Sequence, residues 1–325
     1  MKYARLGRTG LEVSRIAFGC MSIGVPGERR PWTLGEAEAR PLYRYAWDNG
    51  INFFDTANSY SEGSSEEITG KLIKELAPRD EIVLATKVFN RMRPGANGAG
   101  LNRKTIFAQL DASLKRLNTD YVDLYQIHRW DSQTPIEETL DALTDTVRAG
   151  KVRYIGASSM YAWQFAKALF TADKHGYARF VSMQNQVNLV YREEEREVLP
   201  LCADQGIGVI PWSQLSSGKL TRPWGEQTKR TTTDANGRTM YQNDVGNQKA
   251  VVQQVGILAQ AHGLPMAQIA MAWLLRKPMV TAPIVGVTKL DHVKDAIAAL
   301  DVTLSADEAK ALDAPYTGRP IVGNQ

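Results

Sequence analysis

Apolar residues along this chain form short continuous runs, separated by longer segments in which they recur at helical spacing. Eight runs have the length and composition of strands that are buried on both faces. They cover residues 16–20, 51–55, 82–87, 121–128, 152–156, 180–184, 208–212 and 281–287. The intervening segments place apolar residues on one stripe, as with Ile106, Leu110, Leu114 and Leu117. The pattern predicts eight strand–helix pairs in strict alternation.

This alternation predicts the fold class. Strands that alternate with helices form a parallel α/β sheet, and the first strand is not followed by the Gly-rich turn of a dinucleotide-binding open sheet. We therefore expect a (β/α)8 TIM barrel, with a doubly wound open sheet as the alternative. The expected barrel fills a single domain over residues 1–325.

The pattern also predicts additions to the barrel. Residues 2–6 and 12–16 flank Gly7-Arg8-Thr9-Gly10 and predict an N-terminal β-hairpin. A polar segment over residues 216–248 predicts a long loop after the seventh strand, of the kind that often serves as a functional lid. Two extra helices are expected before the eighth strand, at residues 249–262 and 265–276.

Proline and glycine mark several expected helix ends. Pro41 suits the first turn of a helix that stops at Gly50, because proline lacks the N–H that the first turn leaves unused. Gly206 predicts the end of a helix over residues 192–205, because glycine readily adopts the left-handed conformation of a C-terminal cap.

Composition narrows the class of protein. The 325 residues are 43% hydrophobic and 23% charged, as in ordinary globular proteins. The two cysteines, Cys20 and Cys202, suit a reducing cytoplasm and form no disulfide framework. The net charge of +4 is well mixed along the chain, and we expect neither secretion nor a membrane span. We expect a cytoplasmic monomer or small homo-oligomer that binds neither membrane nor nucleic acid.

Three expected strands end in a titratable residue, namely Asp55, Lys87 and His128, and Tyr60 follows Asp55 in the same turn. In a parallel barrel the carboxyl ends of the strands open onto one mouth, where active sites lie. Asp55 and Tyr60 alone have plainer interpretations, as a turn cap and a loop aromatic, whereas Lys87 and His128 each end an apolar strand and should face the mouth. Because all four side chains are expected at the same mouth, they predict a proton-transfer site.

The chemistry of these four groups is coherent. A lysine at the end of an apolar strand needs a charged partner, and Asp55 on the neighbouring strand can supply it. An ammonium beside a phenol stabilises the phenolate, so Tyr60 could act as a general acid with Lys87 as its neighbour. An imidazole at His128 could hydrogen-bond a carbonyl oxygen. The set predicts a site that protonates an oxygen as negative charge develops on it.

These residues, in this order and on these strands, resemble the aldo-keto reductase family. Residues 54–60 (Phe-Asp-Thr-Ala-Asn-Ser-Tyr) resemble its first signature, while Lys87 and the pair Ile127-His128 match its other catalytic positions. The resemblance covers essentially the whole chain. Four further segments resemble a narrower bacterial subgroup of this family, one member of which is linked to 1-deoxyxylulose 5-phosphate formation. They are residues 63–67, 126–131, 154–160 and 191–197.

The resemblance implies a reductase that uses NADPH/NADP+ and no metal. Hydride would pass reversibly between the nicotinamide and a carbonyl carbon, and Tyr60 would protonate the oxygen. Lys87 and Asp55 would tune the tyrosine, and His128 would orient the substrate.

The resemblance also implies a coenzyme site. The nicotinamide carboxamide would lie at Ser158, Ser159 and Gln184, with the ring stacked on Trp212. The pyrophosphate would be wrapped by Ser213, Gln214, Leu215, Gly218 and Lys219. The adenosine 2′-phosphate would lie at Gly286, Val287, Thr288 and Lys289, with His292 and Asp295 near the adenine. Lys289 would favour NADPH over NADH.

The substrate is less defined. Trp32, Trp130 and Trp224 are candidates for the wall of a pocket that takes a small carbonyl or alcohol. Two other functions stay open. One is a coenzyme-bound regulatory or scaffold subunit of the same fold, as in the potassium-channel β-subunits of this family. The other is a barrel enzyme acting on phosphosugars, which would need a phosphate site after the last two strands but neither Trp212 nor Gln184.

Overall fold

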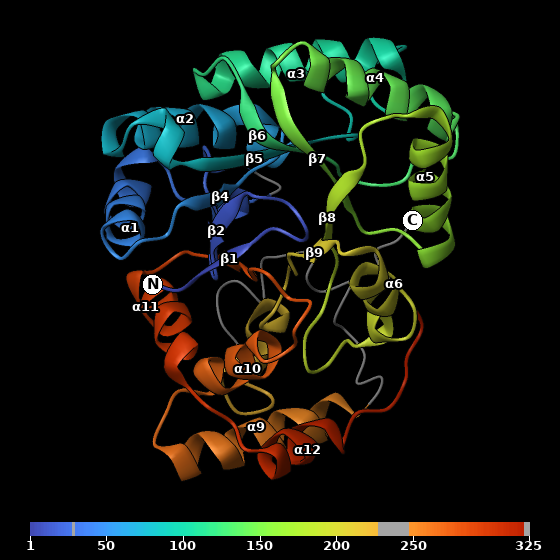
Figure 1. The fold of residues 1–325 in the computed structure, drawn as a ribbon. Helices are drawn as coiled ribbons and strands as arrows, with labels where there is room; N and C mark the ends of the chain where they lie inside the picture. The colour runs from blue at the N-terminus through green and yellow to red at the C-terminus, as the bar shows by residue number, and fades with distance from the viewer. Residues whose placement is uncertain (28–29, 227–246, 322–325) are drawn as a thin grey trace.

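The computed structural model describes residues 1–27, 30–226 and 247–321, and its centre is one eight-stranded parallel sheet (Figure 1). The strands follow the order β10-β3-β4-β5-β6-β7-β8-β9. Their bounds are β3 Ala17–Gly19, β4 Phe53–Asp55, β5 Val83–Val88, β6 Val122–Ile127, β7 Val152–Ser158, β8 Phe180–Gln184, β9 Gly208–Val209 and β10 Ile284–Gly286. Each expected strand overlaps one of these; β5 runs one residue and β7 two residues past the expected ends at 87 and 156.

Helices surround this sheet (Figure 1). They are α1 Glu36–Asp48, α2 Ser64–Leu76, α3 Arg103–Leu117, α4 Ile136–Arg148, α5 Ala162–His175, α6 Val198–Gln205, α9 Gln248–His262, α10 Met266–Leu275, α11 Leu290–Ala298 and α12 Ala306–Asp313. The two extra helices expected before the last strand are α9 and α10. Within the described parts of the chain, every helix is too short or too polar to cross a bilayer.

Backbone hydrogen bonds close the sheet into a barrel. Val209 of β9 donates its N–H to the carbonyl of Met279 (3.1 Å) and accepts from the N–H of Thr281 (2.8 Å). Ile284 of β10 donates to the carbonyl of Pro211 (2.8 Å). These bonds join the first and last positions of the sheet order, so the (β/α)8 barrel is confirmed and the open-sheet alternative is wrong.

The predicted N-terminal hairpin is confirmed. Strands β1 (Tyr3–Arg5) and β2 (Glu12–Ser14) pair antiparallel. The turn between them packs against the segment before β9, where Arg8 N–H donates to the carbonyl of Gly206 (2.9 Å). Gly7 has φ +59°, and a Cβ there would lie 2.6 Å from the oxygen of Gly206. The hairpin therefore covers the amino-terminal end of the barrel, opposite the mouth.

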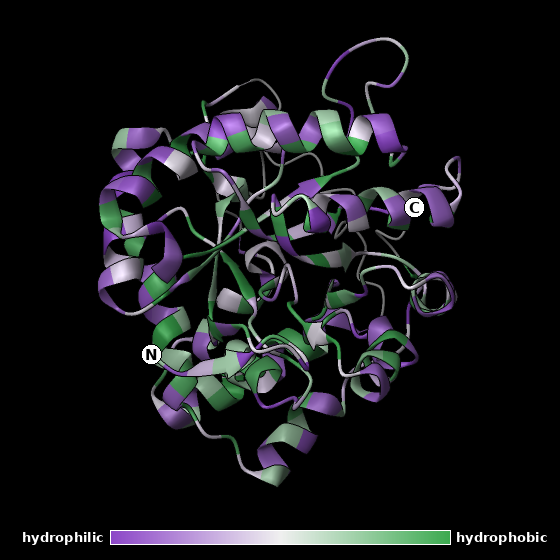
Figure 2. Ribbon diagram, turned by 45° about the horizontal axis from the view of Figure 1, so that its top comes forward, coloured by the Kyte–Doolittle hydropathy of each residue, from purple (hydrophilic) through white to green (hydrophobic). Residues whose placement is uncertain are grey.

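The core has two parts. Inside the barrel, apolar side chains from the hairpin and the strands form one buried cluster: Leu6, Val13, Ala17, Phe53, Val83, Ala85, Leu124, Ile210, Ala282 and Ile284. A larger cluster lies between the strands and the helices. Figure 2 shows the hydrophobic colour concentrated on the strands and hydrophilic positions on the surrounding helices. Apolar side chains thus fill much of the barrel interior.

A buried ion pair fixes the position of β5, which carries Lys87. Glu66 of α2 is fully buried and accepts a hydrogen bond from Thr86 Oγ1 (2.5 Å). Its other oxygen accepts from Arg116 Nε of α3 (2.7 Å). A buried carboxylate is stable only when it is paired in this way. The pair therefore joins two helices to the strand that delivers Lys87.

The prediction that Pro41 lies in the first turn of its helix is wrong. Helix α1 begins at Glu36, and Pro41 lies one turn further on. The start is set by Gly35, whose N–H donates to Glu38 Oε2 (3.2 Å), and by two acidic residues near the positive end of the helix dipole. These local signals outweigh the single backbone hydrogen bond that proline removes.

The predicted helix over residues 192–205 is wrong in its first half. A 3-10 turn, η4 (Glu193–Glu195), comes first, and α6 begins only at Val198. Glu193 is buried and accepts hydrogen bonds from Tyr316 OH (2.7 Å) and Arg319 N–H (2.8 Å) in the tail after α12. These tertiary bonds outweigh the helical tendency of the glutamates. The expected stop at Gly206, with φ +65°, is confirmed.

The expected loop over residues 216–248 is described only at its ends. A 3-10 segment, η5 (Ser216–Thr221), follows β9, and Gln248 already belongs to α9. Residues 227–246 lie outside the described residues, as does the larger part of the predicted lid.

Candidate active site

The structure brings the four predicted catalytic residues together at the barrel mouth. Asp55 ends β4, Lys87 lies near the end of β5, and His128 directly follows β6. Tyr60 begins the 3-10 turn η2 (Tyr60–Gly63). The four side chains are at most 9% exposed. The rings of Tyr60 and His128 lie edge to face, 5.7 Å apart.

The loop that carries Tyr60 is held against β5 by its backbone. Asn58 N–H donates to the carbonyl of Lys87 (3.2 Å), and Tyr60 N–H donates to the carbonyl of Ala57 (3.1 Å). The short path from β4 leaves the tyrosine directly above the end of the neighbouring strand. This local geometry places the phenol next to the lysine.

Lys87 is the centre of the site. Its Nζ lies 2.5 Å from Asp55 Oδ1, 2.8 Å from the carbonyl oxygen of Thr56 and 3.3 Å from Tyr60 OH. Burial opposes the positive charge, but Asp55 and Tyr60 outweigh it and raise the pKa of Lys87 above its ordinary value. Lys87 therefore stays an ammonium and directs its charge at the tyrosine oxygen.

The second oxygen of Asp55 is bound by two glutamines. Gln126 Nε2 of β6 donates to Asp55 Oδ2 (2.9 Å), and Gln184 Nε2 of β8 donates to the same atom (3.0 Å). Gln184 Nε2 also donates to Gln126 Oε1 (3.0 Å). The amide nitrogen of Gln184 thus faces the floor of the site, which leaves its carbonyl oxygen as the atom that could accept from a carboxamide.

The sequence prediction missed Gln126. One signal was available, because residues two apart on a strand point to the same side. Gln126 lies two residues before His128 in an otherwise apolar run. Its amide could therefore have been expected to face the barrel interior, but nothing in the sequence shows that it reaches Asp55.

His128 is oriented by Asn90, a second residue that the prediction missed. Asn90 Nδ2 lies 3.1 Å from His128 Nδ1 and 3.1 Å from Ser59 Oγ. Because this amide nitrogen can only donate, Nδ1 accepts and the proton of the neutral ring lies on Nε2. Burial, followed by the charges of Lys87, Arg129 and Arg30, lowers the pKa of His128 well below its ordinary value. His128 is therefore a neutral donor.

Two arginines flank this group and were not predicted as site residues. The guanidinium of Arg30 lies 5.5 Å from the centre of the Tyr60 ring. Arg129 follows His128 in sequence, and its Nη1 donates to the carbonyl of His128 (2.6 Å). Arg129 could have been considered from its position after His128, whereas Arg30 lies in a loop far from the others in sequence.

The residues predicted at the nicotinamide end meet beside the quartet. Trp212 Nε1 donates to Ser159 Oγ (3.1 Å), and Ser158 Oγ donates to the carbonyl of Gln184 (2.9 Å). Trp212 is bound to the preceding strand segment, since its N–H donates to the carbonyl of Asn185 (2.9 Å). Together they form a partly apolar rim with hydroxyl groups, which suits an aromatic amide.

The predicted pyrophosphate loop has an unusual backbone. Positive φ angles occur at Ser213 (56°), Ser216 (49°), Ser217 (52°) and Gly218 (90°). A right-handed residue followed by a left-handed one turns their N–H groups toward one side, as in anion-binding nests, and Leu215 (φ −108°, ψ 13°) followed by Ser216 forms such a step. Gln214 is buried within this loop, and Leu215 accepts from the N–H of Gly218 (2.9 Å).

Lys219 closes the same loop. Its Nζ donates to Gln248 Oε1 at the start of α9 (2.8 Å) and lies 5.2 Å from the centre of the Trp224 ring. These contacts hold the ammonium at the edge of the loop, so it could approach a phosphate there. They also show that Trp224, predicted as a substrate wall, packs against the loop lysine.

The predicted 2′-phosphate segment follows β10. Lys289 is exposed and caps the amino terminus of α11, where the helix dipole favours an anion. Gly286 is exposed, Val287 accepts from Ser22 Oγ (2.5 Å), and Thr288 N–H donates to His292 Nδ1 (3.3 Å). Asp295 accepts from Gln268 Nε2 (2.8 Å), which joins α11 to α10.

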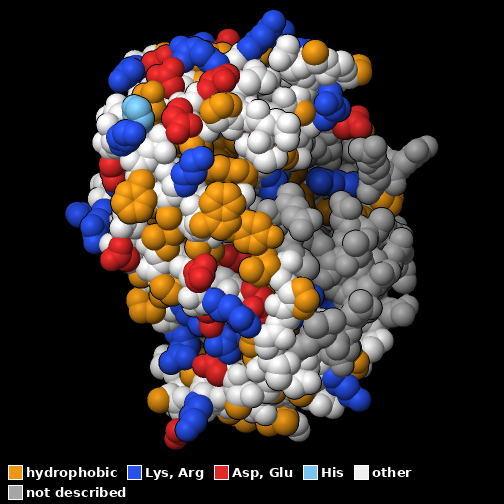
Figure 3. Space-filling view, turned by 90° about the vertical axis from the view of Figure 1, so that its right-hand side faces the viewer, with side chains coloured by type: hydrophobic (Ala, Val, Ile, Leu, Met, Phe, Trp, Pro, Cys, Tyr) orange, Lys and Arg blue, Asp and Glu red, His pale blue; other side chains and the backbone are white. Residues whose placement is uncertain are grey.

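The other two predicted substrate tryptophans are both half-buried. Trp130 packs against Trp163 of α5, with ring centres 6.2 Å apart. Trp163 and Phe170 are exposed on α5, and Figure 3 shows apolar side chains gathered on this side of the molecule. Trp32 lies between β3 and α1. The role of these residues in a substrate pocket stays a prediction.

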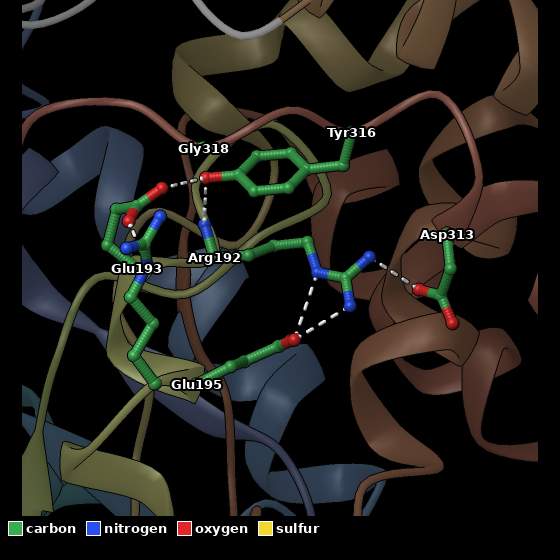
Figure 4. A pocket seen from close by; sticks show the side chains of 7 residues that line it. Arg192, Glu193, Glu195, Asp313, Tyr316 and Gly318 are labelled. Atoms are coloured by element: carbon green, nitrogen blue, oxygen red, sulfur yellow. Dashed lines mark hydrogen bonds and ion pairs between the residues drawn. The ribbon is translucent and has the colours of Figure 1, made fainter.

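A hollow of about 370 Å³ lies away from the four predicted catalytic residues, where the tail after α12 meets η4 (Figure 4). Arg192 of this hollow pairs with Glu195 (2.7 Å) and Asp313 (2.7 Å). Tyr316 OH donates to Glu193, as described above. The charged groups neutralise one another, so the hollow is a junction between two segments of the chain, and none of the quartet lines it.

Comparison with known proteins agrees with this geometry. The model of the Aldo/keto reductase family matches residues 15–316. The chain belongs to the aldo/keto reductase family. The versiconal hemiacetal acetate reductase of Aspergillus parasiticus is similar to this aldo/keto reductase over nearly the whole length of both. The two are 42% identical over 99% of this chain and 98% of that protein.

A putative aryl-alcohol dehydrogenase of Schizosaccharomyces pombe is similar to this aldo/keto reductase to the same degree. It is 43% identical over 99% of this chain and 97% of its own length. An aldo-keto reductase of Fusarium vanettenii is 41% identical over 99% of this chain and 93% of its own. These relatives are fungal, and they do not support the bacterial subgroup that the sequence motifs predicted.

Proposed function

We propose that this aldo/keto reductase interconverts carbonyl compounds and alcohols, with NADPH/NADP+ as coenzyme and Tyr60 as the general acid. One observation carries the proposal. The Tyr60 hydroxyl is hydrogen-bonded to a buried ammonium, Lys87, that Asp55 keeps charged. A carbonyl oxygen that gains negative charge needs such an acid close by.

The proton moves as follows. When bound, NADPH supplies the hydride that bonds to the carbonyl carbon. The O–H bond of Tyr60 breaks, and its proton goes to the carbonyl oxygen, so the product is an alcohol. The phenolate that remains is stabilised by Lys87. His128 donates from Nε2 to the same carbonyl oxygen and holds it toward Tyr60. In the oxidative direction each transfer is reversed.

NADPH is proposed over NADH because of the segment after β10. Lys289 is an exposed cation at the amino terminus of α11, and both features favour a phosphate monoester. The nest-like backbone of residues 213–218 supports a pyrophosphate at the neighbouring rim position. The two segments adjoin because Ile284 bonds to Pro211.

Aromatic aldehydes are the first substrates to test. The name of the Schizosaccharomyces pombe relative concerns aryl alcohols, and Trp130 and Trp212 offer aromatic surface near the mouth. We propose the barrel as a single catalytic unit over the whole chain, working in the cytoplasm.

The acid is tested by Tyr60→Phe, which removes one hydroxyl and keeps the ring. We expect the rate of benzaldehyde reduction to fall about 100-fold or more, because no other group donates the proton. NADPH binding, measured by quenching of tryptophan fluorescence, should persist. Tyr3→Phe on the hairpin, at the opposite end of the barrel, is the matched control and should retain activity. Wild-type turnover by Tyr60→Phe would contradict the proposal.

A further inference from the structure

Two positive charges lie beside the proposed acid and are not used by the reaction. The Arg30 guanidinium is 5.5 Å from the centre of the Tyr60 ring. Arg129 is fixed by its bond to the carbonyl of His128 (2.6 Å). Both lie close enough to His128 to disfavour its protonation. The two arginines therefore approach the quartet from two different loops.

Neither arginine has an acidic partner among the residues that the structure describes. The ion pairs formed within residues 1–27, 30–226 and 247–321 do not include Arg30 or Arg129. The nearest acid in sequence to Arg129 is Asp131, which instead accepts from Leu101 N–H (2.8 Å) and Thr134 Oγ1 (2.8 Å). Arg30 Nη1 is buried and finds no hydrogen-bond partner in the same part of the chain.

The sum of the side-chain charges around Tyr60 shows whether the site needs a counter-charge. Lys87 is offset by Asp55, and His128 is neutral, because its pKa is lowered by burial and by its cationic neighbours. Among the residues that the structure describes, Arg30 and Arg129 thus leave an excess of two positive charges around Tyr60. Burial also lowers the pKa of Arg129. Partly buried charges without a partner destabilise the folded protein, so this excess is best explained by a ligand that supplies the counter-charge.

The chemistry of the missing partner follows from the side chains. A guanidinium binds carboxylate and phosphate through two parallel N–H donors, and it stays charged where lysine would lose its proton. A group bound by both arginines would lie within a few bonds of a carbonyl held by Tyr60 and His128. A neutral substrate would leave the Nη1 donor of Arg30 without a partner.

We infer that Arg30 and Arg129 form an anion-binding subsite beside Tyr60, and that the preferred substrate carries a carboxylate or phosphate in addition to its carbonyl group. This inference rests on the proposed reductase function and gives it a substrate class.

The test compares charged and neutral aldehydes of the same shape. The pairs are 4-carboxybenzaldehyde against methyl 4-formylbenzoate, and 4-formylphenyl phosphate against 4-methoxybenzaldehyde. We expect wild-type kcat/KM to favour the charged member of at least one pair by about tenfold or more, as a charged hydrogen bond provides. The pair with the larger ratio identifies the anion. Arg30→Gln and Arg129→Gln should each lower that ratio about tenfold, mainly through KM of the charged aldehyde.

Three variants complete the design. Arg30→Lys and Arg129→Lys keep the charge and should restore part of the ratio. Lys174→Gln removes an exposed cation at the far end of α5 and should leave the ratio unchanged. A wild-type ratio near one for both pairs would overturn the inference. Equal losses for charged and neutral aldehydes would also overturn it, because the arginines would then act on Tyr60 and not on the substrate. So would a weaker NADPH affinity that accounts for the whole effect.

A binding measurement separates this inference from the proposed function. Benzoate and benzamide, which cannot be reduced, are titrated calorimetrically into the NADP+-loaded protein and its variants. Tighter binding of benzoate that Arg30→Gln abolishes, without reduction of any aldehyde, would support the subsite and overturn the reductase function. Reduction of neutral aldehydes without preference for benzoate or a charged aldehyde would support the reductase function and overturn the anion-binding subsite.

Discussion

At the scale of single residues, the site is defined by what binds each polar atom. Asp55 accepts from Lys87, Gln126 and Gln184, so both of its oxygens are occupied before any ligand arrives. Asn90 fixes which nitrogen of His128 carries the proton. A group held in one orientation needs no rearrangement when the reaction begins, which is a large part of how polar sites accelerate reactions.

His128 should make the protein less stable in acid. Its folded-state pKa lies well below the ordinary 6.5, mainly because of burial. Below pH 6.5 the unfolded chain binds a proton that the folded protein rejects, so stability falls as pH decreases from 6.5 toward the folded-state pKa. Above 6.5 this loss is absent. The slope reaches at most about 1.4 kcal/mol per pH unit.

Urea unfolding at pH 8, 6.5 and 5 checks this expectation. His128→Gln cannot titrate, so it should lose less stability than wild type between pH 6.5 and 5, while the difference between the two proteins should not change from pH 8 to 6.5. Parallel losses in both proteins below pH 6.5 would show that His128 is not the group responsible.

At the scale of elements, the β10–α11 turn is the segment that we propose selects the coenzyme. Lys289 combines a side-chain charge with the amino terminus of a helix, and both act within one turn. Lys294 lies on the same helix, is exposed, and pairs at 3.6 Å with Asp291. The two lysines differ in their distance from the helix start, which makes them a matched pair.

Lys289→Ala should weaken NADPH binding about tenfold and NADH binding little, because only NADPH carries the 2′-phosphate. Lys294→Ala should change neither. Fluorescence titration of both coenzymes against both variants measures the difference. Equal losses for NADPH and NADH in Lys289→Ala would show that Lys289 contacts a part common to both coenzymes.

Elements were predictable from the sequence where local signals agreed. The apolar runs predicted all eight strands, and α6 ends where Gly206 predicted a stop. Prediction failed where distant partners decide the structure. Glu193 leaves the helical pattern because Tyr316 and Arg319 bind it, more than 120 residues away. Arg30 reaches Tyr60 from another loop, and no spacing rule relates the two.

At the scale of the whole molecule, the segment that follows α12 packs against the loop between β8 and α6 and is hydrogen-bonded to it. In Figure 1 it rises from α12 past α6. Tyr316 OH donates to Glu193 Oε1 (2.7 Å) and accepts from Arg192 N–H (3.0 Å). Burial and then the bond to Glu193 raise the pKa of Tyr316. The segment therefore holds the loop that follows β8, the strand that ends at Gln184.

Tyr316→Phe should lower the free energy of unfolding by about 1–2 kcal/mol, as expected for a hydrogen bond to a carboxylate. A double-mutant cycle with Glu193→Gln, followed by urea unfolding, measures how much of this loss belongs to the pair. We expect the two losses to be clearly non-additive. Simple additivity would show that the hydroxyl and the carboxylate contribute independently.

The bonds of Asp55 have a consequence for how this barrel can change. Through Lys87, Gln126 and Gln184, one carboxylate links β4 to β5, β6 and β8. A substitution there would disturb the architecture and the chemistry together, so the floor of the pocket has little freedom to vary. Arg30 and the predicted substrate residues Trp32 and Trp130 lie instead on loops outside the strands. Descendants of such a protein can acquire new specificities by altering those loops, while the reaction itself is inherited unchanged.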